Sequence, residues 1–292
     1  MVRMRYRTMN TAAAEIFYRE TVPERGADNK PPILLLHGFP SSSHQYSGLM
    51  RLLGNEFHMI APDYPGFGQS RDLSPAGGFE YSFENISRTV EAFIDKLGLE
   101  RFVLYVFDFG APVGFRIAAR RPELIAGVIV QNANAYEAGL SDAARHFVSI
   151  QRHDEAGVKE LDGLLTLDGT RFQYFTGVSD PEAISPDGYT LDQHYLELPG
   201  RKAHLIELLL DYKSNVDLYP AWQEWFRRAS PPAQILWGRN DPLFLEAGAR
   251  AYLTDLPNAE FHLFDTGHFA LEERLDTIAP LVAGFVNRLS SS

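Results

Sequence analysis

The 292-residue chain alternates short apolar runs, each ending at a Gly, Pro, Asp or Asn loop, with amphipathic stretches. Runs as short and apolar as these indicate strands that are buried on both faces of a sheet. Where apolar residues instead recur at helical spacing, the pattern predicts a helix that Gly98 ends. Strands that alternate with helices predict βαβ units and a parallel sheet covered on both faces. The strand-like runs are Ile33–Leu36, Phe57–Ala61, Phe102–Phe107 and Val128–Val130, and the helical stretch is Ser82–Gly98.

The strand pattern is interrupted once and then resumes. Residues 135–226 show helical segments with Pro and Gly breaks and no convincing buried strand. Strands are predicted again at Gln234–Trp237 and Glu260–Phe264, and Ile278–Leu289 is expected to be a closing helix. The simplest interpretation is one α/β domain that is interrupted by a helical insertion.

Composition and the lengths of the apolar runs exclude several classes of protein. Hydrophobic residues make up 45% of the chain and charged residues 22%, which is ordinary for a globular protein and argues against disorder. No apolar run approaches the ~18 residues that span a bilayer, so we expect no membrane partner. The basic start, Met1–Arg7, is not followed by the apolar segment of a secretory signal. We therefore expect a cytoplasmic protein.

Charge and cysteine content exclude further classes. The chain has no cysteine, which rules out disulfides, thiolate zinc sites and a cysteine nucleophile. Its 38 acidic and 27 basic residues give a net charge of −11, which argues against nucleic acid as a partner. The nine His residues show no HExxH-type pairing, so we expect no metal ion and no organic cofactor. The sequence leaves open whether the protein is a monomer or a homodimer.

Four loops that follow predicted strands carry residues suited to catalysis. Asp108 follows the run that ends at Phe107, and His37-Gly38-Phe39-Pro40 follows the first run. Asp241 and His268 each follow one of the late strands. Because ligands bind outside the carboxyl ends of parallel strands, these loops should converge at one edge of the sheet. Taken singly, each has a plainer interpretation, as a helix N-cap, a turn or a surface histidine.

Together these segments resemble the α/β-hydrolase superfamily. Val106–Ala111 is similar to its nucleophile elbow, with Asp108 in place of the usual Ser, and small residues follow as a sharp turn requires. Val106 stands where the usual pattern has Gly. Haloalkane-dehalogenase-like elbows also tolerate Val at this position. The acid at Asp241 and the histidine at His268 follow in the superfamily's order. The form HGFP at residues 37–40 is similar to epoxide hydrolases and fluoroacetate dehalogenases.

The resemblance covers nearly the whole chain and is weakest at residues 136–189. It implies an α/β-hydrolase fold, with a mostly parallel central sheet flanked by helices. It also implies that residues 1–134 and 227–292 form the core and that the insertion, residues 135–226, is a helical cap domain. The superfamily's oxyanion hole corresponds here to the backbone N–H groups of Phe39 and Phe109.

An aspartate nucleophile would change the class of reaction. Attack by a carboxylate on an ester would give an anhydride, whereas attack at a saturated carbon gives an alkyl-enzyme ester. By the resemblance, His268 would activate the water that hydrolyses this ester, and Asp241 would hold the imidazole tautomer. The Phe39 and Phe109 amides would stabilise the oxyanion. We expect Asp108, at a helix N-terminus, to be ionised at neutral pH.

Two reactions use such an arrangement, epoxide opening and dehalogenation. Halide release commonly needs a Trp after the nucleophile, together with an Asn or a second Trp. Here Phe109 follows Asp108, Phe39 follows His37-Gly38, and residues 134–221 contain no Trp. The Arg residues with which fluoroacetate dehalogenases bind carboxylate are replaced by Phe109 and Pro112. Residues 134–221 also hold 15 acidic and 7 basic residues, which disfavours an anionic substrate.

Epoxide opening instead needs a proton donor, which cap tyrosines supply in epoxide hydrolases. Tyr212 resembles one of these tyrosines, although it could be a structural residue at a helix end. The usual second Tyr would fall near His153, which could donate instead or simply face solvent. Other candidate donors are Tyr136, Tyr174 and Tyr195.

The sequence therefore predicts an epoxide-hydrolase-like enzyme that acts on a small, neutral, fairly apolar substrate. One alternative is a hydrolytic dehalogenase with an atypical halide site. Another is a non-catalytic ligand-binding protein with the same fold. The intact set of Asp108, Asp241 and His268 argues against the last, because a binding protein does not need all three.

Overall fold

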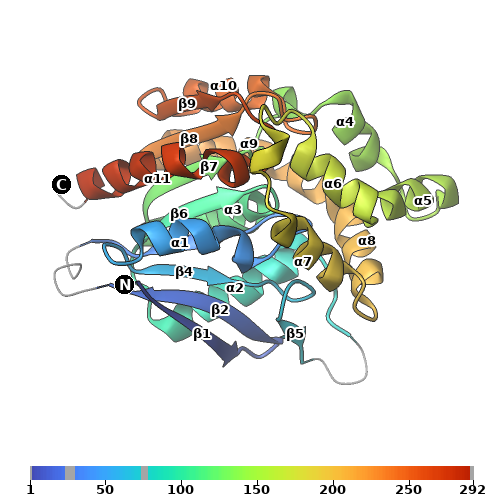
Figure 1. Ribbon diagram of the computed structural model, residues 1–292, viewed down its shortest axis with the longest axis horizontal. Coiled ribbons are helices and arrows are strands. Elements are labelled where there is room, and N and C mark those ends of the chain that lie inside the picture. The colour runs from blue at the N-terminus through green and yellow to red at the C-terminus, as the bar shows by residue number, and fades with distance from the viewer. Residues whose placement is uncertain (1, 24–29, 74–77, 290–292) are drawn as a thin grey trace.

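The computed structural model describes residues 2–23, 30–73 and 78–289, and a mostly parallel sheet forms their centre (Figure 1). Strand order in this described part is β1-β2-β4-β3-β6-β7-β8-β9, and the short β5 pairs with β2. The first two strands are antiparallel to each other, and β2 is antiparallel to β4. Pairing from β4 through β3 to β9 is parallel, as predicted. The bounds are β1 Arg3–Asn10, β2 Ala14–Val22, β3 Ile33–Leu36, β4 Met59–Pro62, β5 Arg71–Asp72, β6 Phe102–Phe107, β7 Ile125–Gln131, β8 Ala233–Gly238 and β9 Glu260–Phe264.

The buried strands divide their side chains between two cores, as expected for a sheet covered on both faces. In β3, Ile33 and Leu35 join one core while Leu34 and Leu36 join the other, because successive side chains of a strand point to opposite faces. Helices α1 and α11 cover the first core, and α2, α3 and α10 cover the second. The helix bounds are α1 Ser47–Leu53, α2 Phe83–Leu97, α3 Gly110–Arg120, α10 Glu246–Asp255 and α11 Ala270–Leu289.

Strand β1 is one of the elements that the sequence did not predict. Its side chains are mostly exposed or half-buried and include Arg3, Arg5 and Arg7, so the segment has no apolar run. Its position comes from an antiparallel register with β2 that runs from Arg3 opposite Val22 to Asn10 opposite Glu15. Backbone pairing at the edge of a sheet leaves little pattern in the sequence, because few side chains are buried there.

Helix α2 confirms the helical prediction at both of its ends. The Ser82 side chain accepts a hydrogen bond from the Asn85 N–H, so Ser82 is an N-cap. Gly98 ends the helix with a φ of 69°, a left-handed conformation that glycine adopts without steric cost. The apolar face predicted between these caps is buried against the sheet, including Phe83, Ile86 and Phe93.

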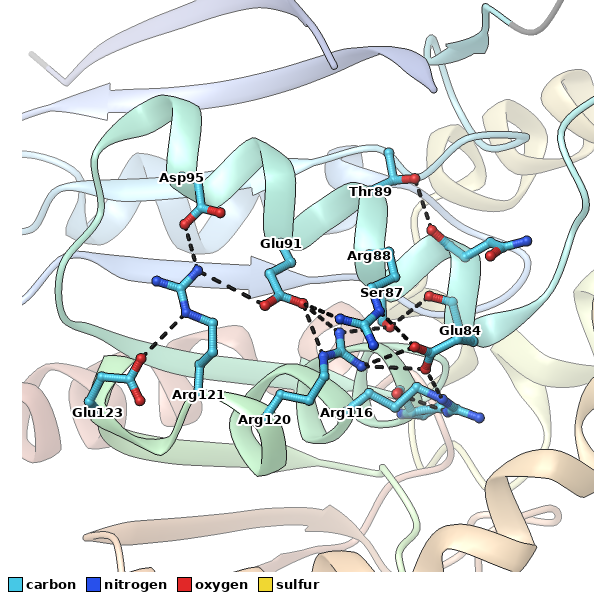
Figure 2. A network of polar contacts seen from close by, with 12 residues as sticks. Glu84, Ser87, Arg88, Thr89, Glu91, Asp95, Arg116, Arg120, Arg121 and Glu123 are labelled. Carbon is cyan, nitrogen blue, oxygen red and sulfur yellow. Dashed lines mark hydrogen bonds and ion pairs between the residues drawn. The ribbon is translucent and has the colours of Figure 1, made fainter. Parts of the chain in front are cut away.

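Ion pairs join α2 to α3, the helix that begins two residues after Asp108 (Figure 2). Arg120 contacts Glu84 and Glu91, and Arg121 contacts Asp95. At its first residue, α3 also lies against β3: a Cβ on Gly110 would lie 2.2 Å from the Leu36 carbonyl oxygen. The position and direction of α3 are thus fixed by both the sheet and α2.

Between β7 and β8 the described chain contains helices and no strand. Figure 1 shows α5, α6, α7 and α8 together at one end of the sheet, and the contacts among them agree. The last helix of the insertion is continuous across the predicted boundary at residue 226, and its second half packs on α3 in the core. The division into core and cap domains stays a prediction. The bounds are α4 Asp142–Ser149, α5 Glu155–Leu164, α6 Leu167–Phe175, α7 Pro186–Leu196, α8 Arg201–Asp211 and α9 Lys213–Ala229.

None of the helices in the described ranges is both long enough and apolar enough to cross a lipid bilayer.

Candidate functional site

Asp108 lies at the end of β6 in a left-handed conformation, with a φ of 49°. Its Oδ1 accepts a 2.6 Å hydrogen bond from the backbone N–H of Phe39, and the Phe109 amide also hydrogen-bonds to the carboxylate. Close approach of the two loops depends on Gly38, because a Cβ there would lie 2.4 Å from the Asp108 Cβ. The two amides expected in an oxyanion hole therefore converge on one carboxylate.

His268 and Asp241 complete the group, as the order of the loops predicted. The His268 Nδ1 lies 2.6 Å from Oδ2 of Asp241, and its Nε2 lies 3.8 Å from Oδ2 of Asp108. With the Nδ1 proton donated to Asp241, Nε2 is an acceptor, and it has no hydrogen-bond partner within the described residues. A water molecule near Asp108 could therefore transfer a proton to it.

Burial changes the pKa of both members of the central pair. It raises the pKa of Asp108 to about 6, although the nearby His268 and the hydrogen bonds from Phe39 and Phe109 oppose the rise. Desolvation outweighs those favourable contacts, but with a pKa of about 6 the carboxyl is still mostly ionised at neutral pH, as expected. Burial lowers the pKa of His268, but the charge and hydrogen bond of Asp241 and the charge of Asp108 leave it raised overall.

Asn132, which was not among the predicted site residues, holds Asp241 in place. Its Nδ2 donates a 2.8 Å hydrogen bond to Oδ2 of Asp241, and its Oδ1 accepts one of 2.9 Å from the Gly238 N–H. The residue has a φ of 38°, which Asn tolerates better than most residues do. Its position after β7, at the same sheet edge as the other loops, was the available signal.

A mainly apolar cavity adjoins Asp108. Three polar side chains line it, those of Asp108, Gln173 and Tyr212, and Asp108 is the only one that is ionised near neutral pH. This lining suits a neutral apolar molecule, since an anionic ligand would be close to a carboxylate and find no cation. The apolar lining residues are Phe39, Phe109, Ala144, Phe147, Val148, Leu161, Leu164, Leu209, Leu243 and Phe244.

Tyr212 lies at the junction of α8 and α9, and the residues around it are anchored to the core. On one side, Oδ2 of Asp211 accepts a 2.8 Å hydrogen bond from the Phe83 N–H at the start of α2. On the other, Arg116 of α3 donates a 2.6 Å hydrogen bond to Oδ1 of Asn215. Since α3 begins two residues after Asp108, the same helix positions two of the three polar groups that line the cavity, Asp108 and Tyr212.

The Tyr212 hydroxyl belongs to a short chain of hydrogen bonds. It is hydrogen-bonded to the Tyr219 hydroxyl, and Tyr219 accepts a 3.3 Å bond from Nδ2 of Asn134. Asn134 can only donate from this nitrogen, so the Tyr219 proton can be donated to Tyr212 and the Tyr212 proton to a ligand. Burial raises the pKa of Tyr212 well above its ordinary value, so the phenol stays protonated. No motif in the sequence pointed to Tyr219 or Asn134.

The other candidate proton donors do not line the cavity. His153 is exposed in the turn before α5. The hydroxyls of Tyr136 and Tyr174 donate to Asp255 and Asp192, at 2.7 and 2.5 Å, and are thereby already engaged. Tyr195 is half-buried on α7, outside the lining residues. Their selection as possible donors to a substrate beside Asp108 was wrong, because helix packing directs them elsewhere.

The side chains that line the cavity offer few N–H or O–H donors to a halide ion. Phe39 and Phe109 present rings without N–H groups, and no Trp or Asn side chain is among the lining residues. The buried Arg116, one turn after Pro112, contacts Glu84 (Figure 2). It also donates hydrogen bonds to Asn215 and Ser214, and it is not among the residues that line the cavity. Within the described ranges, no group of three or more His, Asp or Glu side chains is arranged to hold a metal ion.

Residues 31–275 match the family described as alpha/beta hydrolase fold. The chain belongs to this family. It is 40% identical over 270 residues to the "uncharacterized hydrolase YNR064C" of Saccharomyces cerevisiae, with 91% of each chain covered. It is 38% identical to haloalkane dehalogenase 2 of Mycobacterium tuberculosis over 102 residues, 35% of each chain.

The fold of this alpha/beta hydrolase is shared with solved dehalogenase structures. The haloalkane dehalogenase DatA of Agrobacterium tumefaciens C58 superimposes with a TM-score of 0.78 at 23% identity, over 98% of this chain and 97% of that one. The resemblance inferred from the loop motifs is thus confirmed at the level of superfamily and fold. The protein is a hydrolase-fold member related to haloalkane dehalogenases.

Proposed function

We propose that the protein is a hydrolase in which Asp108 is the nucleophile and an alkyl-enzyme ester the intermediate, and that it opens an epoxide to a diol. The observation that carries the proposal is the presence of two complementary groups in the lining of one cavity. A carboxylate held by backbone amides faces an apolar space that also contains a phenol with a strongly raised pKa. Such a pair supplies a nucleophile for a saturated carbon and an acid for the departing oxygen.

In the first step, an oxygen of Asp108 attacks an epoxide carbon and the ring C–O bond breaks. The departing oxygen takes the proton of Tyr212, which leaves a β-hydroxy ester on Asp108 and a tyrosinate. Once Tyr212 has lost its proton, the Tyr219 hydroxyl, which accepts a hydrogen bond from Asn134, can rotate to donate its own proton in a hydrogen bond to the tyrosinate. No base is needed here, because Asp108 is already mostly ionised at neutral pH.

In the second step, water attacks the ester carbonyl of Asp108 while Nε2 of His268 takes its proton. The negative charge develops on the oxygen held by the Phe39 and Phe109 amides, the interaction that an oxyanion hole provides. Collapse releases the diol and regenerates the carboxylate, and the proton on His268 returns to the tyrosinate through solvent. Esterification also removes the Asp108 charge, one of the contributions that raise the pKa of His268, and so favours its basic form.

A second candidate function is hydrolytic dehalogenation, and the relationship to haloalkane dehalogenases favours it. The same two steps would apply, with halide as the leaving group and no proton required. The apolar cavity would accept a haloalkane as readily as an epoxide. What argues for the epoxide is the absence of Trp and Asn from the lining, together with the presence of the phenol.

A His268→Gln variant tests the shared chemistry. Incubated with terminal epoxides and with haloalkanes, it should accumulate one substrate mass on the peptide that contains Asp108, because alkylation proceeds while hydrolysis stops. Epoxides add their full mass, whereas haloalkanes add the alkyl group without halogen, so mass spectrometry distinguishes the two functions. The Asp108→Asn/His268→Gln double variant is the matched control and should remain unlabelled.

If neither class labels Asp108, the alkyl-enzyme mechanism is wrong and a ligand-binding role gains support. The wild-type enzyme offers an independent check in ¹⁸O-water. In a single turnover the label should enter the Asp108 carboxylate, since water attacks the enzyme's ester. Product labelled on the first turnover would show that water attacks the substrate directly.

A further inference from the structure

Gln173 of α6 is a buried polar residue for which the structure shows no structural use. Its side chain is 2% exposed and lines the cavity beside Asp108. Its Nε2 has no hydrogen-bond partner within the described residues. Rotation about the last side-chain torsion exchanges nitrogen and oxygen, so the carboxamide can present its N–H groups to the cavity.

A second buried glutamine, on the adjacent helix α7, has a structural role. Gln193 of α7 is 7% exposed, and its Oε1 accepts a 3.1 Å hydrogen bond from the Thr170 hydroxyl. Its Nε2 donates a 2.9 Å bond to Glu197, so both ends of this amide are used within the protein. Gln193 is not among the residues that line the cavity.

An amide without a partner lowers stability, because its hydrogen bonds to water are lost and nothing replaces them. An apolar side chain of similar volume would fill the same space without this cost. Unpaired buried polar groups are found where a ligand supplies the missing partner, as in sites that select a substrate by its polar atoms. The unpartnered amide of Gln173 therefore indicates a hydrogen-bonding ligand atom inside the cavity.

We propose that Gln173 is a substrate-binding residue that donates an N–H to the epoxide oxygen, as the second donor beside Tyr212. This inference rests on the proposed epoxide function. An epoxide oxygen has two lone pairs and can accept from both groups. Only Tyr212 can transfer a proton, and Gln173 stabilises the negative charge that develops as the ring opens.

The second donor is thus a glutamine, at a place in the mechanism where epoxide hydrolases usually have a second tyrosine. It also defines the substrate class more closely: a neutral epoxide with apolar substituents, whose oxygen is the one polar atom facing the cap. Substituents would pack on Phe147, Val148 and Leu164, all of which line the same cavity. A second polar group on such a substituent would find no partner among those three side chains.

Gln173→Met in the His268→Gln background tests the assignment by single-turnover labelling of Asp108. At saturating epoxide, the labelling rate should fall about 10- to 100-fold, the scale for loss of one hydrogen bond to a group that becomes charged. A residue that served only as cavity wall would change the half-saturating concentration and leave the limiting rate alone. Thermal unfolding gives a second readout, in which Gln173→Met should be at least as stable as its parent.

Gln193→Met is the matched control, with the same chemical change in a glutamine whose hydrogen bonds are satisfied. It should lower the melting temperature and leave the limiting labelling rate unchanged. An unchanged limiting rate in Gln173→Met would overturn the proposal, as would destabilisation comparable to that of Gln193→Met, since either result means a structural role. Failure of both Gln173→Met and Gln173→Leu to fold would count as such destabilisation.

The two proposals can fail separately. If the His268→Gln parent is never labelled by an epoxide, the proposed function fails and the assignment of Gln173 falls with it. If the parent is labelled and Gln173→Met is labelled at the same limiting rate, only the assignment of Gln173 is wrong.

Discussion

The backbone N–H of Phe39 donates a 2.6 Å hydrogen bond to Oδ1 of Asp108. In a serine hydrolase the corresponding amide would contact an oxygen of the substrate, whereas here it contacts the enzyme's own carboxylate. Oδ1 is therefore already placed where charge would develop during hydrolysis of an ester on Asp108, while Oδ2 lies on the His268 side. The geometry thus suits the second step of the proposed reaction before any substrate binds.

The first prediction concerns the pH dependence of alkylation. Burial raises the pKa of Asp108 to about 6, and only the ionised carboxylate is a nucleophile. The alkylation rate of His268→Gln should therefore fall as pH drops through about 6, to roughly a tenth of its plateau one pH unit lower. Loss of the His268 charge removes an opposing interaction, so the midpoint in this variant should lie at or somewhat above that of the wild type. A midpoint near 4 would contradict the burial of the nucleophile.

The pH dependence of hydrolysis of the intermediate should follow the protonation of His268, not that of Asp108. His268 must be neutral to act as a base, and Asp241 holds its pKa above the usual value. The hydrolysis rate of the wild-type intermediate should therefore increase with pH up to the pKa that His268 has in the intermediate, which lies below that of the free enzyme because the Asp108 charge is gone, and then level off. Rapid-quench measurement of the labelled enzyme gives this rate separately from alkylation. A hydrolysis rate that is independent of pH between 5 and 8 would argue against His268 as the base.

The second prediction tests the hydrogen-bonded tyrosines. Tyr212→Phe should slow alkylation by an epoxide about 10- to 1000-fold, because the departing oxygen loses its acid. Tyr219→Phe should have a smaller effect in the same direction, since Tyr212 remains but its tyrosinate loses a donor. Because the pKa of Tyr212 is raised well above 10, the wild-type rate should not decline between pH 8 and 10. Tyr136→Phe is the matched control and should leave the alkylation rate unchanged.

Tyr212 also separates the two proposed reactions. A halide leaving group needs no proton, so haloalkane labelling should be much less sensitive to Tyr212→Phe than epoxide labelling. Equal rates of epoxide labelling in the variant and the wild type would remove Tyr212 from the mechanism. Labelling by haloalkanes with none by any epoxide would favour the dehalogenase.

The third prediction concerns Asn132, which we expect to position Asp241. Asn132→Gly removes both side-chain hydrogen bonds but suits the positive φ, whereas Asn132→Ala removes the same bonds and adds backbone strain. Both variants should slow hydrolysis of the intermediate about equally, and Ala should be less stable than Gly by about 1 kcal/mol. Alkylation should change little, because Asp241 acts on His268. Hydrolysis that is slowed only in the Ala variant would point to strain and not to positioning.

The fourth prediction links the nucleophile to stability. The folded-state pKa of Asp108, about 6, lies above the ordinary value of 3.8, so the folded state binds the proton more tightly than the unfolded chain. The charged carboxylate therefore costs stability as pH rises from about 4 to 6, and the full cost remains above that range. Asp108→Asn should raise the free energy of unfolding at pH 7.5 by about 1–3 kcal/mol, since one pKa unit corresponds to about 1.4 kcal/mol.

Urea unfolding of Asp108→Asn and wild type at pH 4 and pH 7.5 checks this linkage. The difference should be small at pH 4, where both chains are uncharged at this position in the folded state. A variant that is less stable than the wild type at pH 7.5 would show that the carboxylate is not destabilising.

Much of the core could be predicted because its signals are local. The runs at Ile33–Leu36, Phe102–Phe107 and Glu260–Phe264 are strands with the predicted bounds. In the first two, every side chain is buried, and a segment with that requirement must be apolar throughout. The site loops could be placed for a related reason, since parallel strands bring their carboxyl ends to one edge.

The edge of the sheet and the insertion were less predictable. Strand β1 is stabilised by backbone pairing with β2, which requires no apolar side chains. In the insertion, the direction of each side chain depends on how the helices pack against one another. Tyr174 and Gln173 are adjacent on α6, yet the tyrosine donates to Asp192 while the glutamine lines the cavity.

The sequence by itself determined the superfamily, and it predicted that the loops that carry Asp108, Asp241 and His268 meet at one edge of the sheet. Each of these depends on a short segment in which neighbouring residues act together. Only the tertiary structure decided that Asn132 is hydrogen-bonded to Asp241 and Tyr212 to Tyr219, and that Nε2 of Gln173 finds no hydrogen-bond partner among the described residues. These relationships join residues from 7 to 109 positions apart, and hydrogen bonds over such separations exist only after packing has brought their donors and acceptors together.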